Sequence, residues 1–295
     1  MKRVLVAGCD GQLGRCVRSL VEGRADYSGI YAGLHASEAA GAVRLDVCDA
    51  GAVEALVARM KPDYVVNCTA YTNVDGAEDD AEACRLLNVD GVRNLAEACS
   101  RHGARLIHVS TDYVFDGTGS RPYIETDPTN PVSVYGRTKL EGERQVERIL
   151  PGQSVILRTA WLYSVYGRNF VKTMLRLGTE RDEIGVVADQ RGTPTYAPVL
   201  AEAVLRVMDS VEWHPGLYHL TGKGQTTWYD FTREIFRIAG VGNCAVKPLT
   251  TEQYPTKASR PAYSALDTGK FERVFGMEIP GWEDSLRRFF VDINR

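Results

Sequence analysis

A tyrosine and a lysine four residues apart offer acid chemistry. Tyr135 and Lys139 lie in the run Ser133-Val-Tyr-Gly-Arg-Thr-Lys-Leu-Glu. Residues at i and i+4 of a helix share one face, so the phenol and the ammonium can act on the same point. A free tyrosine has a pKa of about 10, and a nearby ammonium favours the phenolate, so we expect Lys139 to lower the pKa of Tyr135. The pair therefore indicates a general acid.

Thr111 is a third candidate at the same centre. It follows the apolar run Leu106-Ile-His-Val-Ser, and the carboxyl end of a parallel strand is where open α/β sheets place their ligands. Thr111 would donate a hydrogen bond to a carbonyl oxygen, Tyr135 would deliver the proton, and a nicotinamide coenzyme would deliver hydride. Lys139 could also hold the nicotinamide ribose. Each residue alone is common, but glycine turn, Thr, Tyr and Lys in this order favour hydride transfer.

A glycine-rich turn near the N-terminus predicts a dinucleotide site. Gly8, Gly11 and Gly14 follow the strand-like run Val4-Leu-Val-Ala and open a helix-like segment. Glycine there lets backbone N–H groups approach a pyrophosphate at the positive end of the helix. The Gly-x-x-Gly-x-x-Gly spacing differs from the Gly-x-Gly-x-x-Gly of many dehydrogenases and resembles the short-chain dehydrogenase/reductase pattern.

The choice between NAD and NADP is open. The run from Ile30 to His35 ends the second expected strand without the acid that commonly binds the adenosine ribose. Asp46 comes later, and its carboxylate could accept from the adenine amine or could simply end a strand in a turn.

Strand-like and helix-like segments alternate, which predicts an α/β fold with a Rossmann-type doubly wound parallel sheet. The expected strands are Val4–Ala7, Ile30–Leu34, Tyr64–Cys68, Arg105–Val109, Val155–Arg158 and Val186–Ala188. The expected helices are Gly11–Val21, Gly51–Arg59, Glu78–Arg101 and Val134–Ile149. The acidic cluster at 78–82 would form a solvated first turn.

The chain should divide near residue 160. After Thr159 aromatic residues, Gly and Pro become more frequent and the alternation less regular. We expect a dinucleotide-binding domain at 1–160 and a smaller α/β, mainly substrate-binding domain at 161–295. The strand near 186–188 and a helix at 198–209 are expected to return to the first domain.

The composition excludes several classes of protein. Of 295 residues, 44% are apolar and 25% charged, with a net charge of -3, as in ordinary globular proteins. Lys and Arg are scattered, which argues against nucleic-acid and membrane partners. No apolar run approaches the roughly 18 residues of a membrane span, and no secretory pattern precedes the glycine turn. We expect a cytoplasmic protein.

Cysteine and histidine suggest no metal or disulfide framework. The seven cysteines lie singly, without zinc spacing. Cys9 could be a reactive thiol beside the glycine turn, although a structural role is favoured. His214 and His219 flank a Pro-Gly turn and are expected in a turn or at the surface.

Several longer motifs narrow the assignment. They are Gly8-Cys-Asp-Gly-Gln-Leu-Gly, Asn67-Cys-Thr-Ala-Tyr-Thr-Asn-Val-Asp, Ser110-Thr-Asp-Tyr-Val-Phe-Asp-Gly, Tyr135-Gly-Arg-Thr-Lys, Arg158-Thr-Ala-Trp, Asp189-Gln-Arg-Gly-Thr-Pro-Thr and Tyr254-Pro-Thr-Lys-Ala-Ser-Arg-Pro. With them the chain resembles, nearly end to end, the dTDP-4-dehydrorhamnose reductase family of extended short-chain dehydrogenases/reductases. The resemblance implies reduction of the 4-keto group of dTDP-6-deoxy-L-lyxo-4-hexulose by NADPH or NADH. The product would be dTDP-L-rhamnose for cell-surface polysaccharide.

The resemblance also implies roles for residues at matching positions. The catalytic residues would be Thr111, Tyr135 and Lys139. The cofactor-binding residues would be Gly8, Gly11, Gln12, Leu13, Gly14, Asp46, Val47, Cys68, Ala70, Tyr135 and Lys139. The substrate-binding residues would be Val74, Asn88, Asp112, Tyr113, Trp161, Asn169 and Arg260.

Within the substrate set, the implied roles differ. Val74, Tyr113 and Trp161 would line the sugar pocket, although a tryptophan after a strand is often core. Asn169 and Arg260 would contact the nucleotide, since a buried diphosphate needs donors. Asn88 would position Lys139 through water, or would only pack or cap a helix.

One departure from the family concerns metal binding. Some members bind Mg²⁺ at a dimer interface through glutamates, whereas this sequence carries Cys16 and Pro198 at those places. Neither supplies a hard oxygen ligand, so we expect no such metal site, and either a monomer or a homodimer.

Two other functions stay open. A nucleotide-sugar epimerase or dehydratase would share the fold and the Tyr/Lys pair, but dehydratases usually carry Asp-Glu after the threonine, where this chain has Asp112-Tyr113. A non-catalytic, NADP-binding regulatory subunit, similar to that of methionine adenosyltransferase, is the second. The intact Thr111, Tyr135 and Lys139 argue against a purely binding role.

Overall fold

A seven-stranded parallel sheet forms the centre of the structure, a computed structural model that describes residues 1–36 and 41–294. Its strand order is β11-β6-β5-β4-β1-β2-β3. The strands are β1 (Lys2–Ala7), β2 (Tyr27–Gly33), β3 (Val43–Arg44), β4 (Tyr64–Asn67), β5 (Arg105–Thr111), β6 (Ser154–Thr159) and β11 (Gly216–His219). The order reverses between β1 and β4, and ligands bind outside the carboxyl ends of the strands at such a point.

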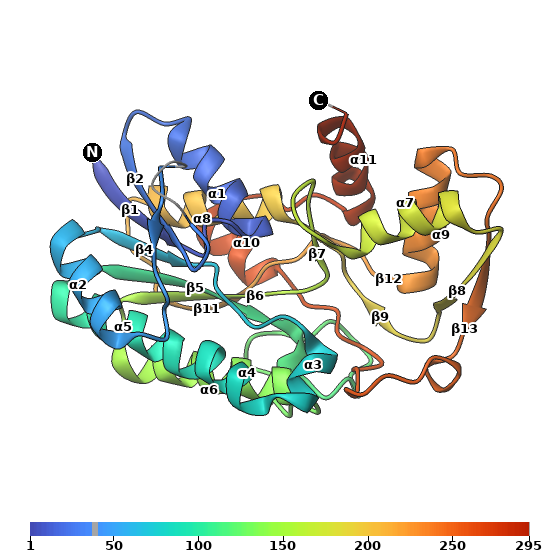
Figure 1. Ribbon diagram of the computed structural model, residues 1–295, viewed down its shortest axis with the longest axis horizontal. Coiled ribbons are helices and arrows are strands. Elements are labelled where there is room, and N and C mark those ends of the chain that lie inside the picture. Colours follow the sequence, from blue (N-terminus) through green and yellow to red (C-terminus); the bar gives the residue numbers. More distant parts are fainter. Residues whose placement is uncertain (37–40, 295) are drawn as a thin grey trace.

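Helices cover both faces of this sheet, as the near-continuous apolar strands require (Figure 1). One layer holds α2 (Ala50–Met60), α5 (Gly91–His102) and α6 (Val134–Ile149). The other holds α1 (Gln12–Glu22), α8 (Ala197–Asp209) and α10 (Gly269–Phe275). The α/β prediction is confirmed. Helix α8, which covers the predicted helix at 198–209, packs on α1, and its assignment to the first domain stays a prediction.

The expectation for residues 186–188 was wrong. They belong to β8 (Glu183–Val187) and the residue after it, and β8 pairs with β13 (Ala245–Leu249) in a separate two-stranded sheet. The seventh strand of the central sheet is β11, which pairs with β6. Its four residues follow a turn, so they carry too little periodicity to be predicted.

The predicted helix at 78–101 is interrupted. It consists of α3 (Val74–Asp79), α4 (Ala81–Arg85), a π-helical turn (Leu86–Asp90) and α5. Asp80 separates α3 from α4. Its side chain caps α4 by accepting from the backbone N of Ala83 at 3.0 Å. The acidic cluster is therefore only partly a solvated turn, because Glu78 accepts from the backbone N of Val134 at 2.8 Å.

The smaller C-terminal part lies beyond the carboxyl edge of the sheet, on the right in Figure 1. Its elements are α7 (Phe170–Glu180), α9 (Trp228–Ala239), α11 (Trp282–Asp292), the β8–β13 pair, and the pairs β7 (Leu162–Tyr163) with β10 (Thr195–Tyr196) and β9 (Arg191–Gly192) with β12 (Thr226–Thr227). The division of the chain near residue 160 remains a prediction.

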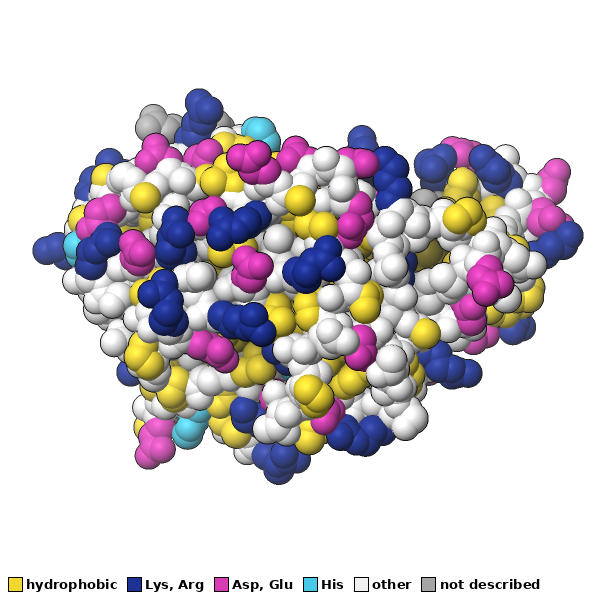
Figure 2. Space-filling view, turned by 90° about the horizontal axis from the view of Figure 1, so that it is seen from below, with side chains coloured by type: hydrophobic (Ala, Val, Ile, Leu, Met, Phe, Trp, Pro, Cys, Tyr) yellow, Lys and Arg dark blue, Asp and Glu magenta, His cyan; other side chains and the backbone are white. Residues whose placement is uncertain are grey.

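The surface carries charges of both signs. Figure 2 shows Lys and Arg side chains interspersed with Asp and Glu on one face of the molecule. Within residues 1–36 and 41–294, no helix is long and apolar enough to cross a membrane.

Helix α6 lies unusually close to its neighbours because two of its residues are glycines. A Cβ at Gly136 would come 2.2 Å from the carbonyl oxygen of Tyr113, and one at Gly142 would come 2.3 Å from that of Asn88. The Ser133 side chain caps the helix by accepting from the backbone N of Gly136 at 3.1 Å.

A buried ion pair joins α6 to the sheet. Arg158 on β6 donates to both carboxylate oxygens of Glu143 at 2.9 and 2.7 Å, and both side chains are at least 96% buried. The Ser110 hydroxyl on β5 also donates to Glu143. This bidentate geometry fixes one position of the helix over β5 and β6.

We expect Glu143→Gln and Arg158→Met each to lower the free energy of unfolding by about 3 kcal/mol, because each leaves a buried group without its partner. The double variant Glu143→Met/Arg158→Met should lose clearly less than the sum of the single losses. Equilibrium urea unfolding measures these differences. Glu141→Gln, at a partly exposed position of α6, is the control and should change stability by less than about 0.5 kcal/mol. Single losses no larger than the control would contradict this role.

Candidate active site

A cleft of about 580 Å³ opens at the carboxyl ends of the central strands. The glycine turn, the ends of β5 and β6, the start of α6 and the segment after β6 line it. Most of the predicted site residues lie along it: Gly11, Gln12, Leu13, Cys68, Ala70, Val74, Thr111, Asp112, Tyr113, Tyr135, Lys139, Trp161 and Asn169. The fold thus brings together residues from distant parts of the chain.

The glycine turn fits a dinucleotide. Gly8 has φ +79°, and a Cβ at Gly14 would lie 2.1 Å from the carbonyl oxygen of Gly8. Gly11 is the N-cap of α1, so free N–H groups of the first helical turn border the cleft. A bound pyrophosphate would meet these donors and the positive end of α1.

Gln12 joins the glycine turn to the C-terminal part. Its side-chain oxygen accepts from Ser164 Oγ and from Asn169 Nδ2, both at 3.0 Å. Asn169 also caps α7 by accepting from the backbone N of Lys172 at 3.1 Å. The two sides of the cleft are therefore connected directly at its rim.

Several predicted cofactor residues lie outside the cleft lining. Gly8 and Gly14 shape the turn from behind. Asp46 is exposed and accepts from the backbone N of Cys48 at 2.9 Å. Val47 is buried, and its carbonyl oxygen accepts from Asn94 at 3.0 Å. The proposed hydrogen bond between Asp46 and the adenine amine therefore stays a prediction.

The three predicted catalytic side chains meet in the cleft. Thr111 ends β5, Tyr135 lies in the first turn of α6, and Lys139 follows one turn later. The Lys139 ammonium donates to the carbonyl oxygen of Val109 at 2.7 Å, which anchors it to β5. Tyr113 packs edge-on against Tyr135, with 5.7 Å between the ring centroids.

Burial sets the protonation of this pair. It raises the pKa of Tyr135, although a hydrogen bond with Thr111 acts in the opposite direction. The expected lowering of this pKa by Lys139 is thus not seen, because desolvation outweighs any attraction to the ammonium. Burial also lowers the pKa of Lys139 to about 8, opposed by the charge of Glu143. Lys139 is therefore mostly charged at pH 7, and Tyr135 holds its proton.

Asp112 competes for the Thr111 hydroxyl. Thr111 Oγ1 donates to Asp112 Oδ1 at 3.0 Å and accepts from the backbone N of Tyr113 at 3.2 Å. Burial raises the pKa of Asp112 to about 6, opposed by hydrogen bonds with Ser264 and Thr111. Since a hydroxyl has one proton, Thr111 must turn from Asp112 before it can donate to a substrate oxygen.

Trp161 is held in a strained conformation. Its φ is +47°, a region that side-chain-bearing residues rarely adopt. Its ring stacks on Trp228 with centroids 3.5 Å apart and planes 10° apart. A Cβ at Gly192 would come 2.7 Å from the Trp161 indole, so only glycine leaves room for this ring. Backbone strain of this kind often occurs at ligand sites.

Sequence reasoning missed Trp228. It begins α9 and lines both the main cleft and a neighbouring cavity of about 330 Å³. A single tryptophan after two threonines carries no signal for this role, because the contact spans 67 residues between Trp161 and Trp228.

The remaining predicted substrate residues lie behind or beside the cleft. Arg260 lines the neighbouring cavity and donates to both oxygens of Asp75, at 3.1 and 2.7 Å. Asn88 is buried, accepts from the backbone N of Tyr71 at 2.9 Å and donates to Thr138 at 3.2 Å. It thus joins α6 to the loop after β4, and its predicted positioning of Lys139 through water stays a prediction.

Cys9 and His219 are both buried. Burial raises the pKa of the Cys9 thiol to about 11, which disfavours a reactive thiolate. His219 is fully buried at the end of β11, so the expectation of a surface or turn position was wrong. No group of three or more metal-ligating side chains occurs in the described part of the chain.

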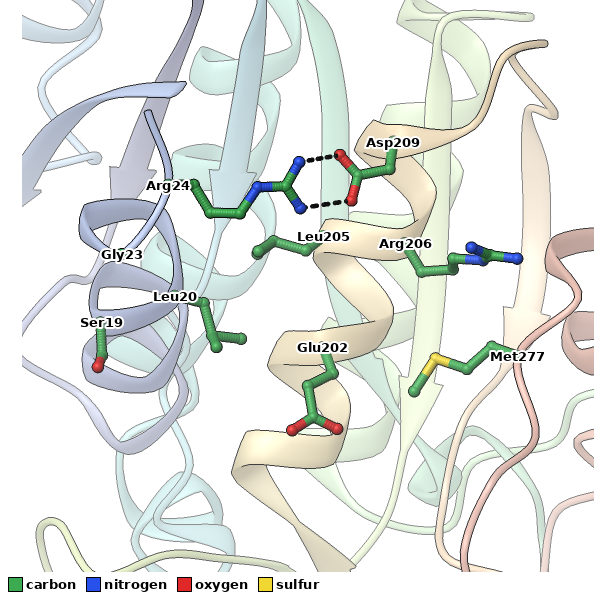
Figure 3. Close-up of a pocket in the computed structure, with 9 residues that line it drawn as sticks. All are labelled: Ser19, Leu20, Gly23, Arg24, Glu202, Leu205, Arg206, Asp209 and Met277. Atoms are coloured by element: carbon green, nitrogen blue, oxygen red, sulfur yellow. Dashed lines mark hydrogen bonds and ion pairs between the residues drawn. The ribbon is translucent and has the colours of Figure 1, made fainter. Parts of the chain in front are cut away.

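A separate groove of about 430 Å³ lies between α1 and α8 (Figure 3). Arg24 and Asp209 form an ion pair at one end, with hydrogen bonds of 2.8 and 3.1 Å. None of the predicted site residues lines this groove. The catalytic candidates all belong to the larger cleft.

Because the Lys139 ammonium is buried, the stability of the protein should depend on pH. Lys139→Met should raise the free energy of unfolding at pH 7 by about 2 kcal/mol, because it removes a desolvated charge at the cost of one hydrogen bond. Between about pH 8 and pH 10.5, the unfolded chain keeps a proton that folded Lys139 has released. Wild-type stability therefore rises relative to the variant across this window.

Urea unfolding of both proteins at pH 7 and pH 9.5 measures the difference. Lys247→Met, at a lysine whose side chain is 64% exposed, is the matched control and should show no such change with pH. A Lys139→Met difference that is constant from pH 7 to pH 9.5 would disprove the lowered pKa.

Comparison with known proteins agrees with this geometry. The family model of the RmlD substrate binding domain matches residues 1–295. The chain is 41% identical to a dTDP-4-dehydrorhamnose reductase of Aggregatibacter actinomycetemcomitans, over 97% of this chain and 98% of the relative. It is 42% identical to a probable dTDP-4,6-dihydroxy-2-methyloxan-3-one 4-ketoreductase of Streptomyces antibioticus, over 99% and 95%.

A solved structure of a dTDP-4-dehydrorhamnose reductase from Bacillus anthracis, in complex with NADP, superimposes with a TM-score of 0.90. It is 36% identical, and the match covers 99% of this chain and all of that one. On this evidence, the chain belongs to the RmlD substrate binding domain family.

Proposed function

We propose that this protein reduces the 4-keto group of dTDP-6-deoxy-L-lyxo-4-hexulose with NADPH or NADH to give dTDP-L-rhamnose. The observation that carries the proposal is the meeting of Thr111, Tyr135 and Lys139 with the glycine turn in one cleft. The identity to named reductases over nearly the whole chain supports the substrate.

Each of these residues would have a separate role in the reduction of a carbonyl group. The coenzyme, when bound, supplies the hydride. Tyr135 holds its proton, because burial raises its pKa, and gives it to the oxygen that becomes a hydroxyl. Thr111 turns from Asp112 and donates to the same oxygen, which orients it. Lys139, fixed on Val109, places a positive charge beside the acid and can hold the ribose.

The substrate would span two cavities. Val74, Asp112, Tyr113 and Trp161 line the main cleft and would contact the sugar. Arg260 lines the neighbouring cavity, and Trp228 borders both spaces, so the nucleotide end would extend past Trp228. Asn169 at the rim would then lie near the diphosphate. In this arrangement the Arg260 guanidinium, which pairs with Asp75, would also face the nucleotide.

The alternatives are less well supported. Tyr113 stands where dehydratases carry glutamate, so the second acid–base group of a dehydratase is missing. A regulatory subunit would not need Tyr135 and Lys139 with shifted pKa values beside Thr111. The Streptomyces antibioticus relative supports a second candidate, reduction of a related dTDP-linked keto sugar. We also propose that the protein is a monomer or a homodimer. Its proposed location is the cytoplasm, where reduced coenzyme is available.

Tyr135→Phe should lower kcat by about a thousandfold, because it removes the proton donor and leaves the ring in place. NADPH absorbance, followed with the dTDP-linked 4-keto sugar, measures the rate, and product analysis should give one dTDP-rhamnose for each NADPH oxidised. The dissociation constant of NADPH should change by less than about threefold, because the phenol is only one of many expected coenzyme contacts in the cleft.

Tyr218→Phe is the control, because this tyrosine lies on β11 and its hydroxyl donates to His214. A Tyr135→Phe variant that keeps more than about a tenth of kcat would contradict the acid role. Sugar conversion without net NADPH oxidation would indicate an epimerase or dehydratase. Coenzyme binding without turnover of any nucleotide sugar would favour the regulatory role.

A further inference from the structure

The adenosine ribose of a dinucleotide usually meets an acid at the end of the second strand. Here β2 ends at Gly33, followed by Leu34 and His35, none of which is acidic. A glycine at this place has no side chain to offer. The space beside it is nevertheless occupied by a carboxylate from another part of the chain.

That carboxylate belongs to Asp10 in the glycine turn. The backbone N atoms of Gly8 and Cys9 both donate to the carbonyl oxygen of Ala32, at 2.8 and 3.0 Å, so the turn lies against the end of β2. Asp10 Oδ2 lies 2.8 Å from the position that a Cβ of Gly33 would take. A side chain on residue 33 would therefore point to the place that the Asp10 carboxylate fills.

Asp10 also faces the coenzyme side of the turn. It lines the main cleft together with Gly11, Gln12 and Leu13, and it is exposed to solvent. The carboxylate thus lies between the pyrophosphate cradle and the end of β2, where an adenosine ribose would pass. A carboxylate accepts hydrogen bonds from a 2′-hydroxyl and repels a 2′-phosphate.

We infer that Asp10 replaces the missing acid of β2, binds the adenosine ribose diol and makes the protein prefer NADH to NADPH. The inference rests on the proposed dinucleotide site but not on the identity of the sugar. It concerns a choice that motif spacing leaves open, because the acid comes from the first turn instead of the second strand.

Two arginine side chains near Asp10 could instead favour NADPH. The Arg18 guanidinium lies 4.4 Å from the Tyr31 ring centroid and pairs with Glu22 at 2.8 Å. Arg15 donates to the backbone oxygen of Asp10 at 3.0 Å. Either guanidinium could attract a 2′-phosphate. The test must therefore separate repulsion by Asp10 from attraction by an arginine.

The experiment measures the dissociation constants of NADH and NADPH without any sugar, from the quenching of tryptophan fluorescence, since Trp161 and Trp228 line the same cleft. Wild-type protein should bind NADH at least about tenfold more tightly than NADPH, equivalent to about 1.4 kcal/mol. Asp10→Asn keeps the shape and removes the charge. It should reduce the NADH preference about tenfold, mainly by strengthening NADPH binding.

Matched variants make the result decisive. Asp284→Asn removes one charge at an aspartate that is 70% exposed on α11, and it should leave the preference unchanged. Arg18→Gln should weaken NADPH binding no more than NADH binding. Preference for NADPH in the wild type, an unchanged preference in Asp10→Asn, or a selective loss of NADPH binding in Arg18→Gln would each overturn the inference.

The result is independent of turnover. If both coenzymes bind as expected but no dTDP-linked keto sugar is reduced, the proposed reaction fails and the role of Asp10 stands. If the sugar is reduced with no effect of Asp10→Asn on coenzyme choice, the role of Asp10 fails and the reaction stands.

Discussion

The ion pair between Glu143 and Arg158 holds α6, the helix that carries the proposed acid Tyr135, against the sheet. Both groups are almost fully buried, so separating them would leave a charge without solvent or partner. Because Arg158 binds both carboxylate oxygens, α6 has one favoured position along β6. Gly136 and Gly142 let the same helix approach the backbone at Tyr113 and Asn88. The relation of Tyr135 to Thr111, on which the proposed chemistry depends, follows from that position.

The same close packing determines the protonation states. Burial raises the pKa of Tyr135 and Asp112 and lowers that of Lys139, so all three groups are biased towards their neutral forms. For an acid that must keep its proton until reaction, this bias is useful. For an ammonium it is destabilising. The site therefore retains a charge at a position where an apolar side chain would give a more stable fold.

The substrate side of the cleft depends on contacts between distant segments. Trp161 keeps its positive φ between Gly192 and Trp228, which come from two different connections of the C-terminal part. Gln12 in the glycine turn binds Asn169 at the start of α7. Such contacts connect the proposed coenzyme cradle to the proposed sugar pocket.

Local patterns along the chain predict five strands of the central sheet, the glycine turn and the candidate catalytic residues. The strands at Val4, Tyr64 and Arg105 are apolar runs with clear boundaries, and Tyr135 and Lys139 share a helix face by spacing alone. These are local properties, which depend only on neighbours along the chain. The likeness of the longer motifs to one family supplied the substrate, which no local pattern could supply.

Contacts between distant segments account for the features that these patterns missed. It placed residues 183–187 beside β13 instead of in the central sheet, since a short apolar run does not specify its partner strand. It buried His219, stacked Trp228 on Trp161, and brought Asp10 to the end of β2. It also reversed the expected effect on the pKa of Tyr135, because desolvation depends on everything that surrounds the phenol. Pairing, stacking and desolvation are set by atoms far apart in sequence, and no spacing along the chain encodes them directly.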